Sequence, residues 1–273
     1  PRNKTLPPEE KVARLAMMKK TSGQERTMVS SSAGDTWPQL LKQHYDTRPG
    51  SPAMRRKYRG IWHTITWRDY YLQVKHLALG LLTLGFQQGD RLLVIGDNAP
   101  EWNYAQLAAQ ANRGISVGMY PGLSLTEITF IAQRTGARFA VVENQEQVDK
   151  FIQVKDELPR LEKIIFWRYK GLAGTNEPLL TGIRQVQQAG TEYETGHPGI
   201  FEQSIASTTN NETCSIVFTS GTTANPKGAV HTYASTKAGA ETILSLAQFL
   251  PSDNIACYLP PAWITEQLIS VGC

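Results

Sequence analysis

The chain has 273 residues, 41% of them hydrophobic, and a formal net charge of +4. This length suits one large or two ordinary domains with a buried core. Its basic residues are interspersed with acids, which argues against a nucleic-acid-binding surface. The cysteines Cys214, Cys257 and Cys273 have no paired spacing, which argues against a disulfide framework or zinc site and favours the reducing cytoplasm. The longest apolar run, around residues 77–84, is far shorter than the ~20 residues of a membrane span.

Residues 1–32 form a polar, basic segment whose only organised part is Lys11–Lys20, KVARLAMMKK. Basic amphipathic segments can bind anionic lipid, so peripheral membrane contact is one interpretation. The small apolar side and the flanking acids Glu9 and Glu10 favour the other, a solvated tail. We therefore expect a basic tail over residues 1–32 and a folded domain over 33–273. The chain also ends at Cys273 inside an apolar run without a helix stop signal, which predicts a longer polypeptide.

The first elements show clear helix signals. A Thr-Trp-Pro start predicts a short helix over residues 36–44, and clustered Pro, Gly and Arg predict a loop over 48–60. Residues 61–66 alternate like a strand. Thr66 is then the expected cap of a helix that stops at Gly85. Its apolar face has the three- to four-residue spacing of a helix and comprises Trp67, Tyr70, Tyr71, Val74, Leu77, Ala78 and Leu81.

Strands and helices then alternate regularly. The predicted strands are residues 91–96, 115–120, 138–143 and 163–167, and the predicted helices are 100–112, 124–134 and 145–158. The strands are apolar throughout rather than alternating, which is typical of a mostly parallel sheet with helices on both faces. The sequence therefore predicts an α/β fold. In such sheets ligands bind beyond the carboxyl ends of the strands.

The last part of the chain continues this pattern after a gap. Residues 170–211 are expected to be a surface connector with one weak helix over 183–188. Strands are predicted at 215–218, 228–231 and 254–259, with a helix over 232–250.

The stretch Thr219–Gly228, TSGTTANPKG, follows the strand at 215–218 and contains four hydroxyl residues, two glycines and a lysine. Glycine lets the backbone turn sharply and bring N–H groups close to a ligand. Successive N–H groups form an anion site, to which hydroxyls add donors and Lys227 adds a positive charge. This composition, without any acidic residue, predicts a polyphosphate site.

Two other interpretations compete with this one. Clusters of Ser, Thr, Gly and Pro between strands are usually only turns. The P-loop pattern G-x-x-x-x-G-K-[ST] does not fit, because Gly228 rather than Ser or Thr follows Lys227. A strand is also predicted after the loop, whereas a P-loop opens directly into a helix, so a P-loop kinase or GTPase is disfavoured.

TSGTTANPKG resembles the phosphate-binding signature of the adenylate-forming superfamily, which includes acyl-CoA synthetases, luciferases and peptide-synthetase adenylation domains. The resemblance implies nucleotide contacts from Thr219, Ser220, Gly221, Thr222, Thr223, Ala224 and Lys227, with Lys227 in the catalytic role and Thr219 as a magnesium ligand. The family usually has glycine where this chain has Ala224. At a left-handed backbone position, alanine would cost roughly 1–2 kcal/mol.

A second stretch, Leu259–Gln267 or LPPAWITEQ, resembles the next motif of the family as it occurs in long-chain fatty acyl-CoA synthetases. Trp263 and Glu266 fit that motif, while Pro261 replaces the usual leucine. The resemblance implies that Trp263 and Glu266 line the acyl and adenylate pocket; a core tryptophan is the competing interpretation of Trp263. ITWRDY, GDNAPEW and ENQEQVDK are also similar to bacterial long-chain members.

The resemblance implies that residues 33–273 are an incomplete N-terminal AMP-binding domain of a long-chain fatty acid–CoA ligase. Such an enzyme uses ATP and Mg²⁺ to form an acyl-adenylate and transfers the acyl group to coenzyme A. The adenine and ribose motifs and the C-terminal lid domain would follow Cys273, so we expect the chain alone not to complete adenylation. A ligase for another carboxylic acid and a non-catalytic binding or scaffold remnant remain alternatives. Small-molecule partners are expected; acyl chain length and oligomeric state are left open.

Overall fold

The computed structural model describes residues 36–172, 174–219, 226–247 and 253–272. The predicted basic tail, including Lys11–Lys20, lies outside the described residues. The helices are α2 Trp37–Thr47, α3 Trp67–Thr83, α4 Pro100–Ala111, α5 Leu125–Thr135, α6 Gln145–Gln153, the 3₁₀ helix η1 Lys155–Glu157, α7 Ile183–Gly196, α8 Ile200–Ala206, α9 Tyr233–Ala247 and α10 Ile264–Gly272. The strands are β1 Pro52–Tyr58, β2 Ile61–Thr66, β3 Arg91–Ile95, β4 Ile115–Met119, β5 Phe139–Val142, β6 Lys163–Phe166, β7 Leu180–Gly182, β8 Thr213–Thr219 and β9 Lys227–Thr232.

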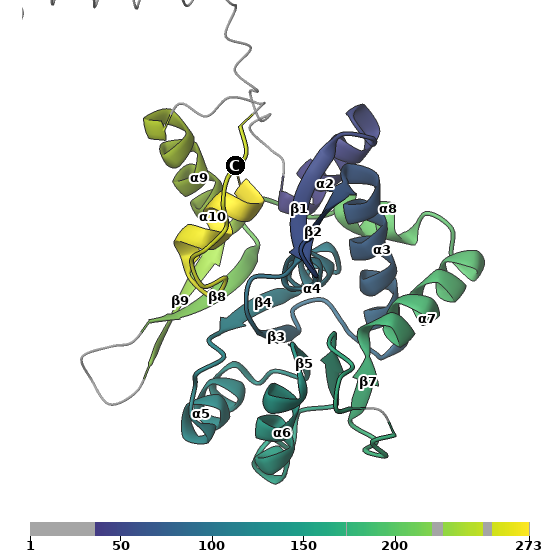
Figure 1. The fold of residues 1–273 in the computed structure, drawn as a ribbon, viewed down its shortest axis with the longest axis vertical. Helices are drawn as coiled ribbons and strands as arrows, with labels where there is room; N and C mark the ends of the chain where they lie inside the picture. The colour runs from purple at the N-terminus through teal and green to yellow at the C-terminus, as the bar shows by residue number, and fades with distance from the viewer. Residues whose placement is uncertain (1–35, 173, 220–225, 248–252, 273) are drawn as a thin grey trace, which may run out of the picture. The chain divides into compact units, whose positions relative to one another are not determined.

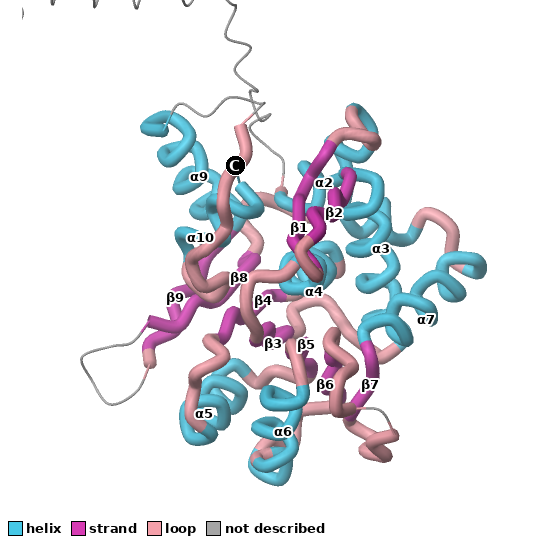
Figure 2. The backbone as a smooth tube through the Cα atoms, in the orientation of Figure 1, coloured by secondary structure: helices cyan, strands magenta, loops and turns pink. Residues whose placement is uncertain are grey.

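A seven-stranded sheet in the order β7-β6-β5-β3-β4-β8-β9 forms the centre of the fold (Figures 1 and 2). All neighbouring strands are parallel except β8 and β9, which form an antiparallel pair at one edge. β4 and β5 lie on opposite sides of β3, so the order of the strands reverses there. In such sheets the crevice beside the reversal, at the carboxyl ends of the strands, is where ligands bind.

Helices cover both faces of this sheet, as β3 shows. Its residues Leu92 and Val94 belong to a core cluster with α2, α3, α4, α7, α8 and α9, whereas Leu93 and Ile95 belong to a second cluster with α5 and α6. Figure 1 shows α5 and α6 on the opposite side of the sheet from α3, α4 and α7. The predicted α/β fold class, with a mostly parallel sheet between two layers of helices, is confirmed.

Local signals in the sequence explain where the helices begin. Thr66 accepts a hydrogen bond from the Asp69 backbone N–H, and the Asp69 carboxylate accepts one from the Thr66 N–H, which completes a capping box for α3. Ser124 and Glu127 form the same arrangement at α5. At the other end of α3, Gly85 has φ +85°, a left-handed conformation that favours glycine.

Two predictions for the chain path are wrong. The expected loop over 48–60 contains β1, which pairs with β2 in a separate two-stranded antiparallel sheet. The expected connector over 170–211 contains β7, α7 and α8. Helix α7 packs closely on α3: a methyl group added to Gly80 would overlap the Val186 carbonyl. Helices α7 and α8 therefore contribute buried residues, among them Val186 and Phe201, to the core.

Candidate functional site

The predicted phosphate-binding stretch connects β8 and β9. β8 is held by parallel pairing with β4 and antiparallel pairing with β9, and Thr219↔Lys227 is the last pair of that register. The Thr219 hydroxyl donates a hydrogen bond to the Lys227 carbonyl oxygen at 3.4 Å. The stretch therefore begins at the last residue of β8, at the edge of the sheet where ligands are expected. Residues 220–225, which include Ser220, Gly221, Thr222, Thr223 and Ala224, lie outside the described residues, and their roles stay predictions.

The hairpin stem carries one positive charge at neutral pH among its described residues. Residues 213–219 and 226–232 contain no Asp or Glu, and Lys227 is exposed. No carboxylate in the described part of the chain forms an ion pair with Lys227. Partial burial lowers the pKa of His231, which keeps that ring neutral at pH 7. The Lys227 ammonium group is thus available to an anion.

Gly228, the last residue of the stretch, lies where β9 packs closely against β8 side chains. A Cβ atom added there would lie 3.0 Å from Ile216 Cγ2 and 3.1 Å from Phe218 Cζ, closer than ordinary contacts. A larger residue at this position would require the Ile216 or Phe218 side chain to move by a few tenths of an ångström, so glycine favours the close approach of β9 to β8 beside Lys227.

The second predicted motif lies on the same edge of the sheet. Asn98, which follows β3, donates from Nδ2 to the carbonyl oxygens of Cys257 at 3.0 Å and Leu259 at 2.8 Å. Residues 254–259 form no strand, so the predicted strand there is wrong. β3 and β4 already have partners on both sides, and neither offers a free edge. The segment instead crosses the carboxyl ends of these strands, held by a side chain.

Trp263 and Glu266 lie at the start of α10. A Cβ atom added to Gly118 of β4 would lie 3.0 Å from Ala262 Cα, so the motif passes directly over the strand beside β8. Trp263 is 45% exposed, whereas Glu266 is buried, and its Oε1 has no hydrogen-bond partner within the described residues. Both motifs are thus brought to neighbouring strands, but the roles of Trp263 and Glu266 stay predictions.

Residues that were not predicted from the sequence build the rim of this edge. The buried Glu143 carboxylate accepts a hydrogen bond from the Asp97 N–H at 2.8 Å and pairs with Arg168 at 2.8 Å. Asn98 was also missed, although it holds the second motif in place. Asn98 follows the predicted strand at 91–96 by two residues, and Glu143 is the last residue of the predicted strand at 138–143. Both also lie in the family-like stretches GDNAPEW and ENQEQVDK, which were the signals available in the sequence.

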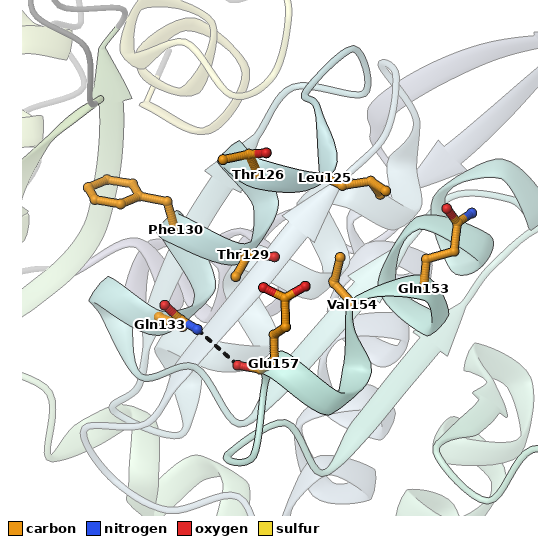
Figure 3. A pocket seen from close by; sticks show the side chains of 8 residues that line it. All are labelled: Leu125, Thr126, Thr129, Phe130, Gln133, Gln153, Val154 and Glu157. Carbon is orange, nitrogen blue, oxygen red and sulfur yellow. Dashed lines mark hydrogen bonds between the residues drawn. The ribbon is translucent and has the colours of Figure 1, made fainter.

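A separate hollow lies between α5, α6 and η1 (Figure 3). Its volume is about 480 Å³, and a hydrogen bond of 3.0 Å from Gln133 Nε2 to the Glu157 carbonyl oxygen lies at its side. Its lining consists of Leu125, Thr126, Thr129, Phe130, Gln133, Gln153, Val154 and Glu157. None of these residues belongs to the β8–β9 hairpin or to residues 253–272, so the hollow is distinct from the candidate site.

Two further features were not found among the described residues, a metal-binding cluster and a membrane-spanning helix. The described residues contain no cluster of three or more His, Cys, Asp or Glu side chains arranged to hold a metal ion. Within the same ranges, no helix is long and apolar enough to cross a membrane.

Two solved structures that share this fold bear the names of acid–CoA ligases. The acetoacetyl-CoA synthetase from Streptomyces lividans has a TM-score of 0.69 at 18% identity, with 87% of this chain and 37% of that chain covered. A putative long-chain-fatty-acid CoA ligase from Rhodopseudomonas palustris has a TM-score of 0.66 at 16% identity, and the match covers 88% of this chain and 55% of that chain. At these identities the likeness shows the fold: the large α/β domain of adenylate-forming ligases.

Sequence comparison then shows the family. The AMP-binding enzyme family model matches residues 41–273, and the chain belongs to this family. It is 31% identical over 252 residues to the long-chain-fatty-acid–CoA ligase ACSBG2 of Xenopus laevis, covering 90% of this chain and 33% of that protein. It is 28% identical to the long-chain-fatty-acid–CoA ligase ACSBG1 of Bos taurus, and the match covers 73% of this chain and 27% of that protein. The chain thus spans about a third of the length of the curated relatives it matches.

Proposed function

We propose that this chain forms the ATP-phosphate-binding part of an AMP-forming long-chain fatty acid–CoA ligase. The observation that supports this most is the Thr219–Lys227 pair, which closes an acid-free hairpin at the carboxyl edge of the sheet in a member of the AMP-binding enzyme family. The named long-chain relatives support the substrate class.

In the proposed first step, a fatty acid carboxylate oxygen attacks the α-phosphorus of ATP. The bond to the bridging oxygen of the β-phosphate breaks, which yields the acyl-adenylate and pyrophosphate. Negative charge builds up on the leaving pyrophosphate, and Lys227 and the hydroxyls of the loop stabilise it. In the second step the thiol sulfur of coenzyme A attacks the acyl carbon, the thiol proton is lost and AMP leaves.

The residues present fit magnesium only in part. Among the described side chains of the hairpin, the resemblance assigns only the Thr219 hydroxyl to the metal, and residues 213–219 and 226–232 contain no carboxylate. A bound Mg²⁺ would neutralise phosphate charge, with phosphate oxygens and water as its other ligands.

Trp263 and Glu266 are proposed to act on the acyl side. The half-exposed Trp263 ring offers an apolar surface at the carboxyl edge. Glu266, buried at the start of α10, would fix the orientation of that turn rather than contact the nucleotide.

The experiment is ATP–pyrophosphate exchange by the full-length protein with palmitate, compared with its Lys227→Ala variant. Exchange is expected in the parent and is expected to fall by about tenfold to a hundredfold in the variant, since a hydrogen bond to a charged group contributes about 1.5–3 kcal/mol. Lys170→Ala, another exposed lysine, serves as the control. Equal exchange by the parent and Lys227→Ala would overturn the assignment of Lys227.

The acid itself is tested by the same assay with a panel of carboxylic acids. Structural neighbours with the same fold include an anthranilate CoA ligase, so the fold does not fix the acid. Exchange driven by an aryl or short-chain acid but not by palmitate would favour a ligase for another acid. No pyrophosphate release with any acid would favour a non-catalytic remnant.

A further inference from the structure

The β1–β2 hairpin projects large apolar side chains into solvent. Tyr58, Ile61 and Trp62 are 53%, 65% and 64% exposed, and they flank the turn at Arg59 and Gly60. The turn is tight: Tyr58 pairs with Ile61, and Arg59 and Gly60 have φ +50° and +83°. Three such side chains within five residues exceed the scattered exposure that is ordinary on a protein surface.

The same hairpin is strongly basic. Residues 52–66 contain four lysines and arginines and no Asp or Glu. Only Arg56 is neutralised by an ion pair within the described residues, with Glu101 at 3.0 Å. Lys57 and Arg59 are exposed at the tip, and the Arg59 guanidinium lies 5.4 Å from the Tyr58 ring. The tip therefore combines uncompensated positive charge with aromatic and aliphatic surface.

The base of the hairpin is fixed in the protein, so the tip is not a loose segment. Met54 and Ile65 form a cross-strand pair and pack against the core cluster that contains α3 and α4. The Arg56–Glu101 ion pair attaches the hairpin to α4, and β2 continues directly into α3 at Thr66. In Figure 1, β1 and β2 stand beside α3 as a separate two-stranded sheet.

We propose that the tip, residues 57–62, docks onto an anionic membrane surface. Tryptophan and tyrosine concentrate at membrane–water interfaces, where an apolar ring and a polar group are both accommodated. Ile61 and Trp62 would enter the boundary between headgroups and acyl chains, and Lys57 and Arg59 would contact lipid phosphates. A nucleic acid would also suit cations and rings, but it provides no apolar phase for the aliphatic Ile61 at the turn. The proposal does not depend on the proposed ligase reaction.

The test is flotation of the chain with phosphatidylcholine vesicles and with vesicles that contain 30% phosphatidylserine. We expect at least tenfold stronger binding to the anionic vesicles and a loss of this preference in 0.5 M salt. The variants Ile61→Ser/Trp62→Ser and Lys57→Glu/Arg59→Glu should each weaken binding at least tenfold. Leu246→Ser on α9, which removes a side chain that is 78% exposed, and Lys170→Glu should change it less than twofold.

A second readout locates the contact. Tryptophan emission should shift to the blue on anionic vesicles in the parent and should shift less in Trp62→Phe, while circular dichroism shows that each variant is folded. Binding that persists in the hairpin variants but disappears without residues 1–32 would assign membrane contact to the tail and overturn the proposal. Hairpin variants that alter oligomeric state or oligonucleotide binding instead of vesicle binding would also overturn it. So would absence of binding in a longer polypeptide that contains this chain.

Discussion

Glu266 lies buried beside the Cys257 thiol, at the point where the second motif enters α10. Loss of solvent around the sulfur, the hydrogen bond with the Glu266 carboxylate and the charge of that carboxylate raise the pKa of Cys257 to about 12, although the residue as a whole is exposed. The thiolate is the reactive form of cysteine, so Cys257 is expected to be unreactive at neutral pH despite its exposure.

We predict that iodoacetamide at pH 8 labels Cys257 slowly and that Glu266→Gln speeds labelling at least tenfold. Removing the carboxylate lowers the thiol pKa, and each pKa unit above the ambient pH is a tenfold difference in thiolate. Peptide mass spectrometry separates Cys257 from Cys214, whose thiol is buried and whose pKa burial raises to about 11. Asp149→Asn, an exposed acid on α6, is the control. Unchanged labelling in Glu266→Gln would show that the carboxylate does not act on the thiol.

Lys75 connects three helices through buried and partly buried charges. It pairs with Glu194 of α7 and Glu202 of α8, and Tyr71 donates to Glu202 at 2.6 Å. Partial burial raises the pKa of Glu202, but the bonds from Lys75 and Tyr71 outweigh this and hold it below its usual range. A carboxyl with a lowered folded-state pKa stabilises the fold above its unfolded pKa, about 4.3 for Glu, and loses this as the pH falls further.

Glu202→Gln is therefore predicted to destabilise the chain by about 1–2 kcal/mol at pH 7, since charged hydrogen bonds contribute about 1.5–3 and partial exposure screens them. Near pH 3, below the unfolded pKa, the difference should shrink, because the unfolded chain takes up the proton that the folded carboxylate resists. Urea unfolding at both pH values measures this, with the exposed Glu192→Gln as control. The same loss at both pH values would contradict an electrostatic origin.

The α3–α7 crossing depends on two glycines that face each other. A methyl group on Gly190 would overlap the His76 carbonyl of α3, and one on Gly80 would overlap the Val186 carbonyl of α7. We predict that Gly190→Ala destabilises the protein by about 2 kcal/mol, because overpacking costs about 1–3 kcal/mol and exceeds the gain in helix propensity. At Gly196 the added methyl meets open space, so Gly196→Ala should be neutral or stabilising. Thermal unfolding of the two variants, measured side by side, tests this, and equal melting temperatures would refute the close crossing.

These elements also show which parts of the fold could be predicted. Helices with local caps, such as α3 and α5, were predicted correctly. Each begins with a capping pair that lies within four residues of sequence, Thr66 with Asp69 and Ser124 with Glu127. For α7 the sequence predicted a helix only over residues 183–188, whereas the helix extends to Gly196. Its polar, glycine-containing sequence is helical because it packs on α3. β1 lacks the alternation of a strand and depends on pairing with β2.

In the candidate site, too, features set by neighbouring residues in the sequence could be predicted, whereas those set by distant contacts could not. The hairpin stem at Thr219 and Lys227 could be predicted because strand, turn and strand are adjacent in sequence. Asn98 could not, because its hydrogen-bond partners lie 159 and 161 positions away. The strand predicted at 254–259 failed because apolar residues crossing the ends of β3 and β4 have the same pattern as a paired strand.

At the scale of the whole molecule, the chain spans about a third of the length of the curated relatives that it matches. The stretch proposed to hold the phosphates lies within this third. Electrostatic stabilisation of a leaving group is strong only where water is excluded and the reacting groups are held in line. Thr219 and Lys227 of the hairpin stem are exposed, so the stem by itself neither excludes water nor holds the reacting groups in line.

We therefore predict that the 273-residue chain binds pyrophosphate weakly through Lys227 but catalyses no measurable ATP–pyrophosphate exchange with palmitate. Loss of a single donor to a developing charge already costs about 10²–10³ in rate, and the chain spans only about a third of the length of the relatives that it matches. Titration calorimetry with pyrophosphate, using Lys227→Ala and Lys170→Ala, measures the binding, and radiolabelled pyrophosphate measures the exchange. Exchange by the chain at the rate of a longer polypeptide would show that these residues already form a complete active site. If Lys227→Ala bound pyrophosphate as tightly as the parent, the assignment of the phosphate site to the hairpin would be wrong.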